Sequence, residues 1–547
     1  MKIFKHISAF AIAALAMLSL ASCDEYLDTL PDDRAELDTP EKVRLLFVSA
    51  YPGSTMNLIN EISSDNVGDN GRGYSSSVLV EELYKFEDVS EEGNDSPYNV
   101  WNGFYGSVAT VNQGLEALDK MEDTPEIRAI RAEGKLIRAY SMFQLATVFC
   151  MAWDPAKADQ YLGLPYPLVP EQNINTRYER GTLRQLYEAI NKDIEEALPD
   201  VDDGIYNIKK YHFNRAAAYA FAARFNLYYL NYEKAIQYAT QALGTDPTTV
   251  MRNYDGYRDL GRTDFGNKWI RSEEDANLLI IAAYSSSCRY LAWGTSARFN
   301  HNSAMASYET YWVAMPWGSG SDANTVIYAN KLYGTNQAVY YPSAEEQFEY
   351  TDKVAGIGYA HIVDPVFTGD MTILDRAEAL TLSGRYDEAV RDINTWITTH
   401  CVEEKNGAVR PIVDVDSISR FVERIDYAPR QPDGDRDRTM RKQFHPQGFT
   451  VQAGTMENML QFILHMRRLE SMAHGTRFYD VKRYGIEFTH FVSGSDPIYF
   501  IAGDLRGAVQ IPQTVIAAGL EANPRMSKEE FDAYIEATTP KVEEEEE

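Results

Sequence analysis

The chain has 547 residues, of which 52 are Lys or Arg and 81 are Asp or Glu, so its formal charge is −29. A surface this acidic repels nucleic acid and anionic lipid headgroups. We therefore expect no nucleic-acid partner, and neutral ligands such as sugars suit the chain better. The hydrophobic share of 44% excludes a disordered chain.

The start of the chain predicts a signal peptide. A short basic segment precedes an uncharged apolar run that ends at Ala21, and this run is shorter than the roughly 20 apolar residues of a membrane-spanning helix. The sequence Leu20-Ala21-Ser22-Cys23 resembles a bacterial lipobox, in which the signal is removed before the cysteine and Cys23 carries lipid such as palmitate. We predict a signal peptide at residues 1–22 and a lipidated tether at 23–38. An ordinary signal, cleaved after a nearby small residue, is the alternative.

The rest of the chain, residues 39–547, is expected to form a single domain that begins with a helix at 39–51. Thr39 can cap this helix and Pro40 suits its first position. Apolar residues recurring at helical spacing predict further helices at 98–121, 124–150, 182–198, 214–230, 232–243 and 457–475, and a pair of helices joined by a turn at 373–399.

Two helical hairpins share one internal spacing. Ala223 lies twelve residues before Ala235, and Ala377 lies twelve residues before Ala389. Small residues at this offset, where two antiparallel helices touch, are typical of tetratricopeptide repeats, with generic helical hairpins as the alternative. We predict a mainly α fold, in which a tetratricopeptide-like scaffold is built from repeat helices at about 98–247, 370–400 and 455–475.

Two stretches interrupt the helical pattern. Residues 63–97 are rich in turn formers, and residues 250–365 carry many Tyr and Trp residues without a regular period, apart from one strand-like run at 278–284. Long loops inside a folded domain are usually functional. We therefore predict an irregular, loop-rich ligand lobe at about 250–365.

These loops supply the candidate ligand-binding residues. A sugar ring stacks on an aromatic face while polar side chains bond its hydroxyl groups, and only these loops offer both kinds of residue. Each tryptophan could instead fill the core of the lobe. The candidates are Trp293, Trp312 and Trp317 as stacking platforms, Tyr74 opposite them, and Arg72 and Asn302 as polar contacts.

No motif in the sequence predicts catalysis, a metal site or a cofactor. A Gly-x-Ser-x-Gly nucleophile motif is absent. His465 and His474 are expected at the surface or at helix ends rather than as metal ligands. The run Asp433-x-Asp435-x-Asp437 lacks the Gly and the terminal Glu of an EF-hand loop and predicts a solvated loop.

Two further groups of residues are expected to be structural. Ion pairs and helix caps that fix the last helix against the body are predicted for Arg467, Arg468, Glu470, Asp480, Lys482 and Arg483. Buried thiols are predicted for Cys150, Cys288 and Cys401, with one disulfide among them as the alternative.

Several short stretches form an ordered set over nearly the whole mature chain. They are Cys23-Asp24-Glu25-Tyr26-Leu27-Asp28 with Pro31, Arg138-Ala139-Tyr140, Gly163-Leu164-Pro165 with Pro167-Leu168-Val169, Arg467-Arg468-Leu469-Glu470, Gly475 through Arg483, and Ile511-Pro512-Gln513 with Asn523-Pro524. Each piece alone is a weak signal, whereas the ordered set is specific. In this set the chain resembles the SusD/RagB family of Bacteroidetes outer-membrane lipoproteins.

The resemblance implies a scaffold of four tetratricopeptide units that carries an irregular ligand lobe. It implies a protein that is lipid-anchored on the extracellular face of the outer membrane and is not an enzyme. Such a protein captures glycan, or sometimes peptide, and delivers it to a SusC-like TonB-dependent transporter. The acidic residues after Cys23 resemble the signal that exports such lipoproteins to the outer face.

Three other functions remain open at this point: peptide capture by the same architecture, an exported glycoside hydrolase, and a protein-binding scaffold. A hydrolase should show a deep cleft with a close carboxylate pair or a metal cluster. A binder should show a shallow surface lined by two or three exposed aromatic residues. A scaffold should show only a groove along its repeats.

Overall fold

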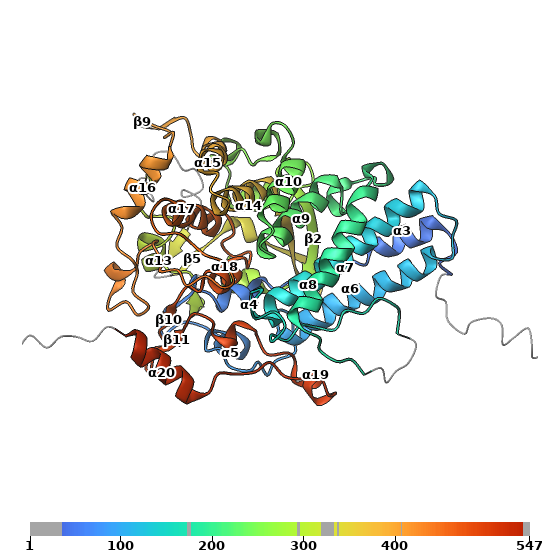
Figure 1. Cartoon of the computed structure of the whole chain (residues 1–547), viewed down its shortest axis with the longest axis horizontal. Coiled ribbons are helices and arrows are strands. Elements are labelled where there is room, and N and C mark those ends of the chain that lie inside the picture. Colours follow the sequence, from blue (N-terminus) through green and yellow to red (C-terminus); the bar gives the residue numbers. More distant parts are fainter. Residues whose placement is uncertain are drawn as a thin grey trace, which may run out of the picture.

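Helices extend across the molecule from α3 on one side to α17 on the other (Figure 1). The computed structural model describes residues 36–171, 177–292, 296–318, 333–335, 338–405 and 407–539, so the predicted signal peptide, Cys23 and Trp293 lie outside the described residues. No helix in these ranges has the length and apolar character that a membrane span needs. The predicted helices are confirmed as α3 (Pro40–Val48), α6 (Pro97–Leu118), α7 (Pro125–Phe149), α8 (Leu183–Ala197), α9 (Arg215–Tyr228), α10 (Tyr232–Leu243), α14 (Gly369–Leu382), α15 (Tyr386–His400) and α17 (Thr455–Glu470).

Capping residues determine where four of these helices begin. Thr39, Ser96, Thr124 and Thr182 each stand directly before a helix and accept a hydrogen bond from a backbone N–H three residues further on. Proline follows the first three of these caps, at a helical position that needs no N–H donor. The helix starts are therefore encoded locally, which explains why the sequence predicts them well.

The repeat helices pack as neighbouring pairs. Helix α7 lies against α6 and α8, α9 against α10, and α14 against α10, α15 and α17. Ala223 and Ala235 are 0% and 1% exposed, and Ala377 and Ala389 are both 0% exposed. Small side chains thus lie where the paired helices touch, as the shared spacing predicts.

A three-stranded antiparallel sheet lies beside the helices, with strand order β2-β7-β6. Strand β2 (Asn277–Tyr284) confirms the predicted strand-like run. Strands β6 (Glu346–Asp352) and β7 (Ile357–Thr368) were not predicted, because their polar and aromatic residues give no clear alternation. The sheet brings Tyr284 of β2 opposite His361 of β7.

The two predicted loop stretches contain short elements that join them. Strand β1 (Gly68–Asp69) pairs with β3 (Phe299–Asn300), so residues more than two hundred positions apart lie side by side. Helix α5 (Val78–Tyr84) follows β1, and α13 (Ser303–Tyr308) follows β3. The 63–97 stretch therefore contacts the predicted lobe.

The late charged residues form a buried network, as predicted. Arg467 of α17 is 0% exposed. Its guanidinium contacts Asp375, donates to Asp480 at 3.2 Å and donates to the hydroxyl of Tyr228 at 3.0 Å. Lys482, on α18 (Arg477–Tyr484), is 5% exposed. These charges link α17 and α18 to the body of the repeats.

The prediction for His465 was wrong, because this residue is only 3% exposed and lies within α17. His474 is half-buried, and its Nδ1 lies 3.0 Å from Asp364 Oδ1. Cys150 and Cys288 are buried thiols as predicted, and Cys401 is also buried. The remaining elements are α4 (Asn57–Ile62), α11 (Arg262–Trp269), α12 (Ser287–Leu291), α16 (Val415–Glu423), α19 (Gln513–Ala517), α20 (Lys528–Thr538), β4 (Tyr333–Thr335), β5 (Ala338–Tyr340), β8 (Glu404–Lys405), β9 (Ala408–Val409), β10 (Phe488–His490) and β11 (Ile498–Phe500).

Candidate functional site

A polar cleft of about 520 Å³ lies where the joined loops meet two later segments. This volume falls within the range of small-molecule sites, roughly 300–1,000 Å³. Its walls come from residues 67–69, 302–308, 432–438 and 489–491, together with Tyr84. We name this feature the outer cleft.

An ion pair fixes one wall of the outer cleft. Arg298 donates from Nε and Nη2 to the two oxygens of Asp69, at 3.0 and 2.8 Å. The backbone N–H groups of Gly71 and Ser493 donate to the same carboxylate at 2.7 and 2.8 Å. Burial alone would raise the pKa of Asp69, but these donors outweigh it and lower the pKa below its ordinary value. Asp69 therefore stays ionised and holds its wall in place.

Aromatic stacking supports the same wall. The ring of Tyr84 lies between Phe299, at 4.3 Å, and His490, at 4.0 Å. Its hydroxyl donates to the carbonyl oxygen of Phe491 at 3.0 Å. Burial raises the pKa of Tyr84 well above its ordinary value, so this hydroxyl remains a donor.

Glu309 anchors the opposite wall. Its carboxylate accepts from Arg438 at 3.0 Å, from Lys442 at 2.7 Å and from Arg468 at 3.1 Å. Burial would raise the pKa of Glu309, but the three cations outweigh it and lower the pKa. This carboxylate ties the 432–438 segment to the end of α13.

The groups that face the outer cleft can bind a neutral, hydroxyl-rich molecule. Tyr308 is 38% exposed and offers a ring face. Asp433 and Asp435 are exposed at the rim and can accept hydrogen bonds from hydroxyl groups. Arg438 adds a donor from the same rim. An aromatic face beside several acceptors and one donor fits a sugar, whereas the carboxylates disfavour an anion.

One of the predicted ligand residues lines this cleft, and two others lie on the turn that follows β1. Asn302 lines the cleft, and its Oδ1 accepts from the backbone N–H of Met305, which caps α13. Arg72 is exposed and donates to the carbonyl oxygens of Ser493, at 2.9 Å, and Gly494, at 3.4 Å. Tyr74 is half-buried on the same turn. The ligand roles of these residues remain predictions.

The predicted tryptophan platforms are placed differently. Trp317 is only 3% exposed, and its ring packs on Trp396 and Phe462 at 5.5 and 5.7 Å. This burial does not agree with a stacking platform and matches the alternative that the residue fills the core. Trp312 is half-buried and packs against the core. Trp293 lies outside the described residues.

The sequence interpretation missed Tyr308, Asp433, Asp435 and Arg438 as cleft residues. Tyr308 is one of many aromatic residues in the predicted lobe, and nothing in the sequence separates it from the buried ones. Asp433 and Asp435 do lie in an exposed loop, as predicted. The backbone N–H groups of Asp433 and Gly434 donate to Asp437 Oδ2, at 3.0 and 3.3 Å, so this carboxylate closes the turn. Asp433 and Asp435 lie close to α13 only because of tertiary contacts, which the sequence does not indicate.

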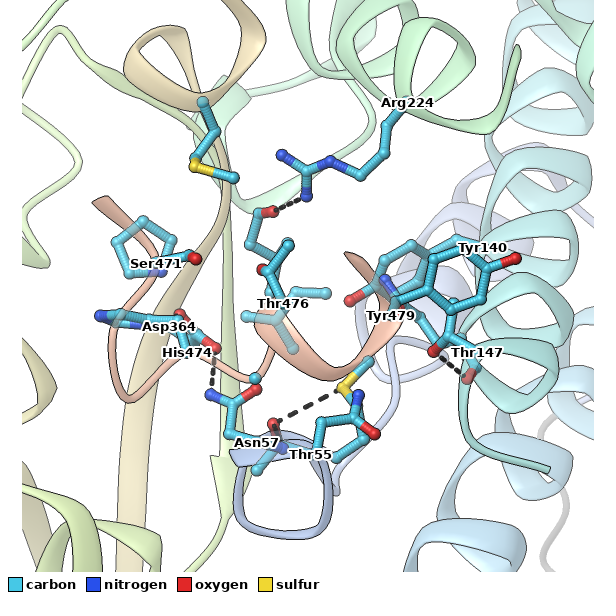
Figure 2. A pocket seen from close by; sticks show the side chains of 18 of the residues that line it. Thr55, Asn57, Tyr140, Thr147, Arg224, Asp364, Ser471, His474, Thr476 and Tyr479 are labelled. Atoms are coloured by element: carbon cyan, nitrogen blue, oxygen red, sulfur yellow. Dashed lines mark hydrogen bonds and ion pairs between the residues drawn. The ribbon is translucent and has the colours of Figure 1, made fainter. Parts of the chain in front are cut away.

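A second, inner cavity of about 100 Å³ lies between the helices and the sheet (Figure 2). Asn57 Nδ2 donates to Asp364 Oδ2 at 2.7 Å, and His474 approaches the other oxygen of the same carboxylate. Burial would lower the pKa of His474, but the charge of Asp364 outweighs it and raises the pKa. Arg224 of α9 and Tyr140 of α7 line the cavity on the side of the repeat helices. Because Asp364 is bonded to two of these neighbours, we interpret the cavity as structural.

Within the described residues, one group of three side chains could offer ligand atoms to a metal ion: Asp370, His400 and Glu470. His400 Nε2 lies 3.0 Å from Glu470 Oε2 and 3.7 Å from Asp370 Oδ1. Arg252 Nε lies 3.5 Å from the second oxygen of Asp370. All four side chains are buried. Because Arg252 and His400 both lie beside these carboxylates, the group also fits a buried polar network.

Comparison with known proteins gives a family match over part of the chain and a fold. Residues 25–227 match the SusD-like family described as "Starch-binding associating with outer membrane". No curated protein matches the chain. Over these residues the chain is similar to the SusD-like family.

Solved structures of similar fold come from Bacteroides species. A SusD superfamily protein from Bacteroides thetaiotaomicron has a TM-score of 0.58 at 18% identity, covering 90% of this chain and 100% of its own. One from Bacteroides fragilis has a TM-score of 0.61 at 16% identity, covering 89% and 99%. A SusD-like carbohydrate binding protein from Bacteroides vulgatus has a TM-score of 0.56 at 14% identity, covering 88% and 96%. At such identities the likeness establishes the fold of this chain and not its ligand.

Proposed function

We propose that this SusD-like protein captures glycan at the cell surface and delivers it to a SusC-like TonB-dependent transporter. The family description names starch binding and association with the outer membrane, and one structural relative is named as a carbohydrate binding protein. The outer cleft carries the proposal, because it combines the ring of Tyr308 with hydrogen-bonding groups on a rigid frame.

Attachment to the outer membrane through acylated Cys23 is part of the proposal. The lipobox resemblance at residues 20–23 and the acidic residues after it support an anchor on the extracellular face. Cys23→Ala should leave the chain unlipidated and release it from the membrane fraction. Mass spectrometry of the mature N-terminus and labelling with a palmitate analogue measure this. An unchanged membrane fraction and an unchanged N-terminal mass in the variant would contradict the anchor.

The transporter partner rests on the family resemblance alone. Mild detergent extraction from the native membrane, followed by capture of a tag on this chain, should co-purify a TonB-dependent transporter in near-equal amount. Recovery of the chain alone under conditions that preserve other membrane complexes would count against this partner.

Glycan binding is tested with the mature, detergent-solubilised protein and a panel of neutral and acidic polysaccharides, by affinity electrophoresis and calorimetry. We expect at least one neutral glycan to bind and Tyr308→Ala to weaken it by about tenfold, the effect of losing one stacked ring. Tyr211→Ala is the matched control, because Tyr211 is 45% exposed and does not line the outer cleft.

Each alternative function gives a different result in the same assays. Binding of a peptide digest without binding of any glycan would support peptide capture in place of the proposal. Cleavage of a glycan by the pure protein would identify an enzyme. If the protein binds neither glycan nor peptide, the remaining alternative is a scaffold that binds other proteins along its repeats.

A further inference from the structure

One face of the β2-β7-β6 sheet carries aromatic side chains that are largely exposed in the described structure. Tyr284 of β2 is 43% exposed, and Tyr359 of β7 is 55% exposed. Ile357, at the far end of the same row, is 60% exposed. Large side chains of this kind usually lie inside a protein or at a binding surface, and here three of them share a short strip of sheet.

The strand register places these residues on one face. Tyr284 pairs with His361, and Glu349 pairs with Tyr359. Because side chains alternate between the two faces of a strand, residues 357, 359 and 361 of β7 point the same way. The alternating burial agrees, since Ala360 and Ile362, which point the other way, are 7% and 6% exposed. We name the exposed face the sheet platform.

Ring contacts hold the sheet platform together. The rings of Tyr284 and His361 lie 4.2 Å apart, and those of Tyr284 and Tyr359 lie 5.7 Å apart at 80°. The row from His361 to Ile357 extends about 14 Å along the strand, at roughly 3.4 Å for each residue. It is therefore long enough to contact more than one ring of an extended chain.

The opposite face of the sheet is anchored, so the platform is rigid. Ala283 and Ile362 pack with Cys288 and Ala292 in a small core beneath the sheet. A substitution on the exposed face leaves this core untouched and should change stability little, as expected for surface positions. The platform can therefore be tested by mutation without unfolding the protein.

The charges around the sheet platform indicate which class of ligand it can bind. Glu349 lies 3.5 Å from His361 on the same face, and the exposed Asp352 ends the same edge strand β6. Acidic groups along an edge disfavour pairing with a further strand, and they repel nucleic acid and anionic membranes. Hydroxyl groups of a neutral ligand can donate to Glu349 while its rings lie on the tyrosines.

We propose that the sheet platform is a second glycan-binding surface, which holds a neutral polysaccharide through stacking on Tyr284 and Tyr359 and hydrogen bonds to Glu349. This proposal rests on the proposed glycan function, and it adds a contact area that is separate from the outer cleft. Two surfaces on one molecule would retain a long glycan more strongly than either alone, because the second contact is made within the same complex.

The test compares the double variant Tyr284→Ala/Tyr359→Ala with Tyr350→Ala. Tyr350 is 52% exposed on the same hairpin. It pairs with Gly358, between Ile357 and Tyr359, so its side chain lies on the other face of the sheet. Affinity electrophoresis in the best-retained neutral polysaccharide should show retention about tenfold weaker for the double variant, with Tyr350→Ala unchanged. Short oligosaccharides, measured by calorimetry, should still bind the double variant at the outer cleft.

The outcomes separate this inference from the proposed function. Normal retention of the double variant, together with loss in Tyr308→Ala, would overturn the sheet platform and leave the proposed function standing. Equal loss in Tyr350→Ala would also overturn it, because the effect would not depend on the face. If the unaltered protein retains no glycan, the proposed function is contradicted, and the sheet platform with it.

Discussion

Arg477 and Asp65 form a paired hydrogen bond across 412 positions of the chain, with Nε to Oδ1 at 2.7 Å and Nη2 to Oδ2 at 2.8 Å. Both residues are at most 5% exposed. Arg468 donates to the backbone oxygen of Asp65 at 2.8 Å. The start of the domain is thereby joined to α17 and α18, next to the segments that form the outer cleft.

We predict that Asp65→Asn lowers the free energy of unfolding by about 3–5 kcal/mol, because the buried guanidinium of Arg477 loses its paired carboxylate. Arg468 loses one of its two carboxylate neighbours and keeps Glu309. Urea denaturation monitored by circular dichroism measures this. The matched control is Glu196→Gln, which removes an exposed carboxylate 2.6 Å from Lys135 and should change stability little. Similar losses in both variants would contradict the importance of burial.

The same pair predicts sensitivity to acid. Burial would raise the pKa of Asp65, but Arg468 and Arg477 outweigh it and hold the pKa well below its ordinary value. The stability from this carboxylate is present above its pKa in the unfolded chain, about 4, and is lost as the pH falls toward the folded-state pKa. Asp65→Asn should therefore lose less stability on acidification than the unaltered protein.

Asp95 should give the opposite pH dependence. Burial raises its pKa to about 6, while hydrogen bonds from Ser285 Oγ, at 2.5 Å, and the Ser286 N–H, at 2.7 Å, only partly offset this. The folded protein thus binds this proton more tightly than the unfolded chain. The stabilisation is complete below about pH 4 and is lost as the pH rises through about 6, a change of about 3 kcal/mol.

Asp95→Asn should therefore stabilise the protein at pH 7.5 and have a clearly smaller effect at pH 4.5. Asparagine suits the site, because residue 95 has φ of 66° and this left-handed conformation is tolerated by Asn. The amide can also keep hydrogen bonds to both serines. Urea midpoints at the two pH values measure the effect, and an equal shift at both would show that this carboxyl titrates normally.

The helical scaffold could be predicted from the sequence because its signals are local. Thr124 and Pro125 mark a helix start within two residues, and the spacing of Ala223 and Ala235 marks a repeat contact. The sheet could not be predicted in full, because β7 pairs with β2 about eighty positions earlier in the chain. Its exposed Tyr359 follows no pattern that indicates burial on one side.

The candidate site was harder to predict for the same reason. Asn302 was found because its loop combines polar and aromatic residues. Tyr308 and Trp317 lie nine positions apart and are chemically alike, yet one is 38% and the other 3% exposed. Only the packing of α17 and α15 against Trp317 separates them. Residue type alone therefore cannot distinguish a platform from a core residue.

Lys482 caps the end of a repeat helix from outside that helix. Its Nζ donates to the carbonyl oxygens of Thr147, at 2.6 Å, Cys150, at 3.1 Å, and Gly507, at 2.9 Å. Lys482→Met keeps the apolar stem but leaves three carbonyl groups without this donor. We expect a loss of at least about 3 kcal/mol in unfolding free energy. Lys482→Arg should recover part of it, and a loss as small as that of Glu196→Gln would contradict the capping role.

Trp317 tests most directly whether a tryptophan of the predicted lobe is a core residue or a stacking platform for ligand. Because its ring is buried against Trp396 and Phe462, Trp317→Ala should cost about 3–5 kcal/mol of stability, the usual loss for a large buried aromatic residue. Under conditions where the variant remains folded, its glycan affinity should equal that of the unaltered protein, whereas Tyr308→Ala should show the reverse pattern. Calorimetry and urea denaturation on the same preparations give both values. A stable Trp317→Ala variant with weakened glycan binding would restore the original prediction of a stacking platform at this residue.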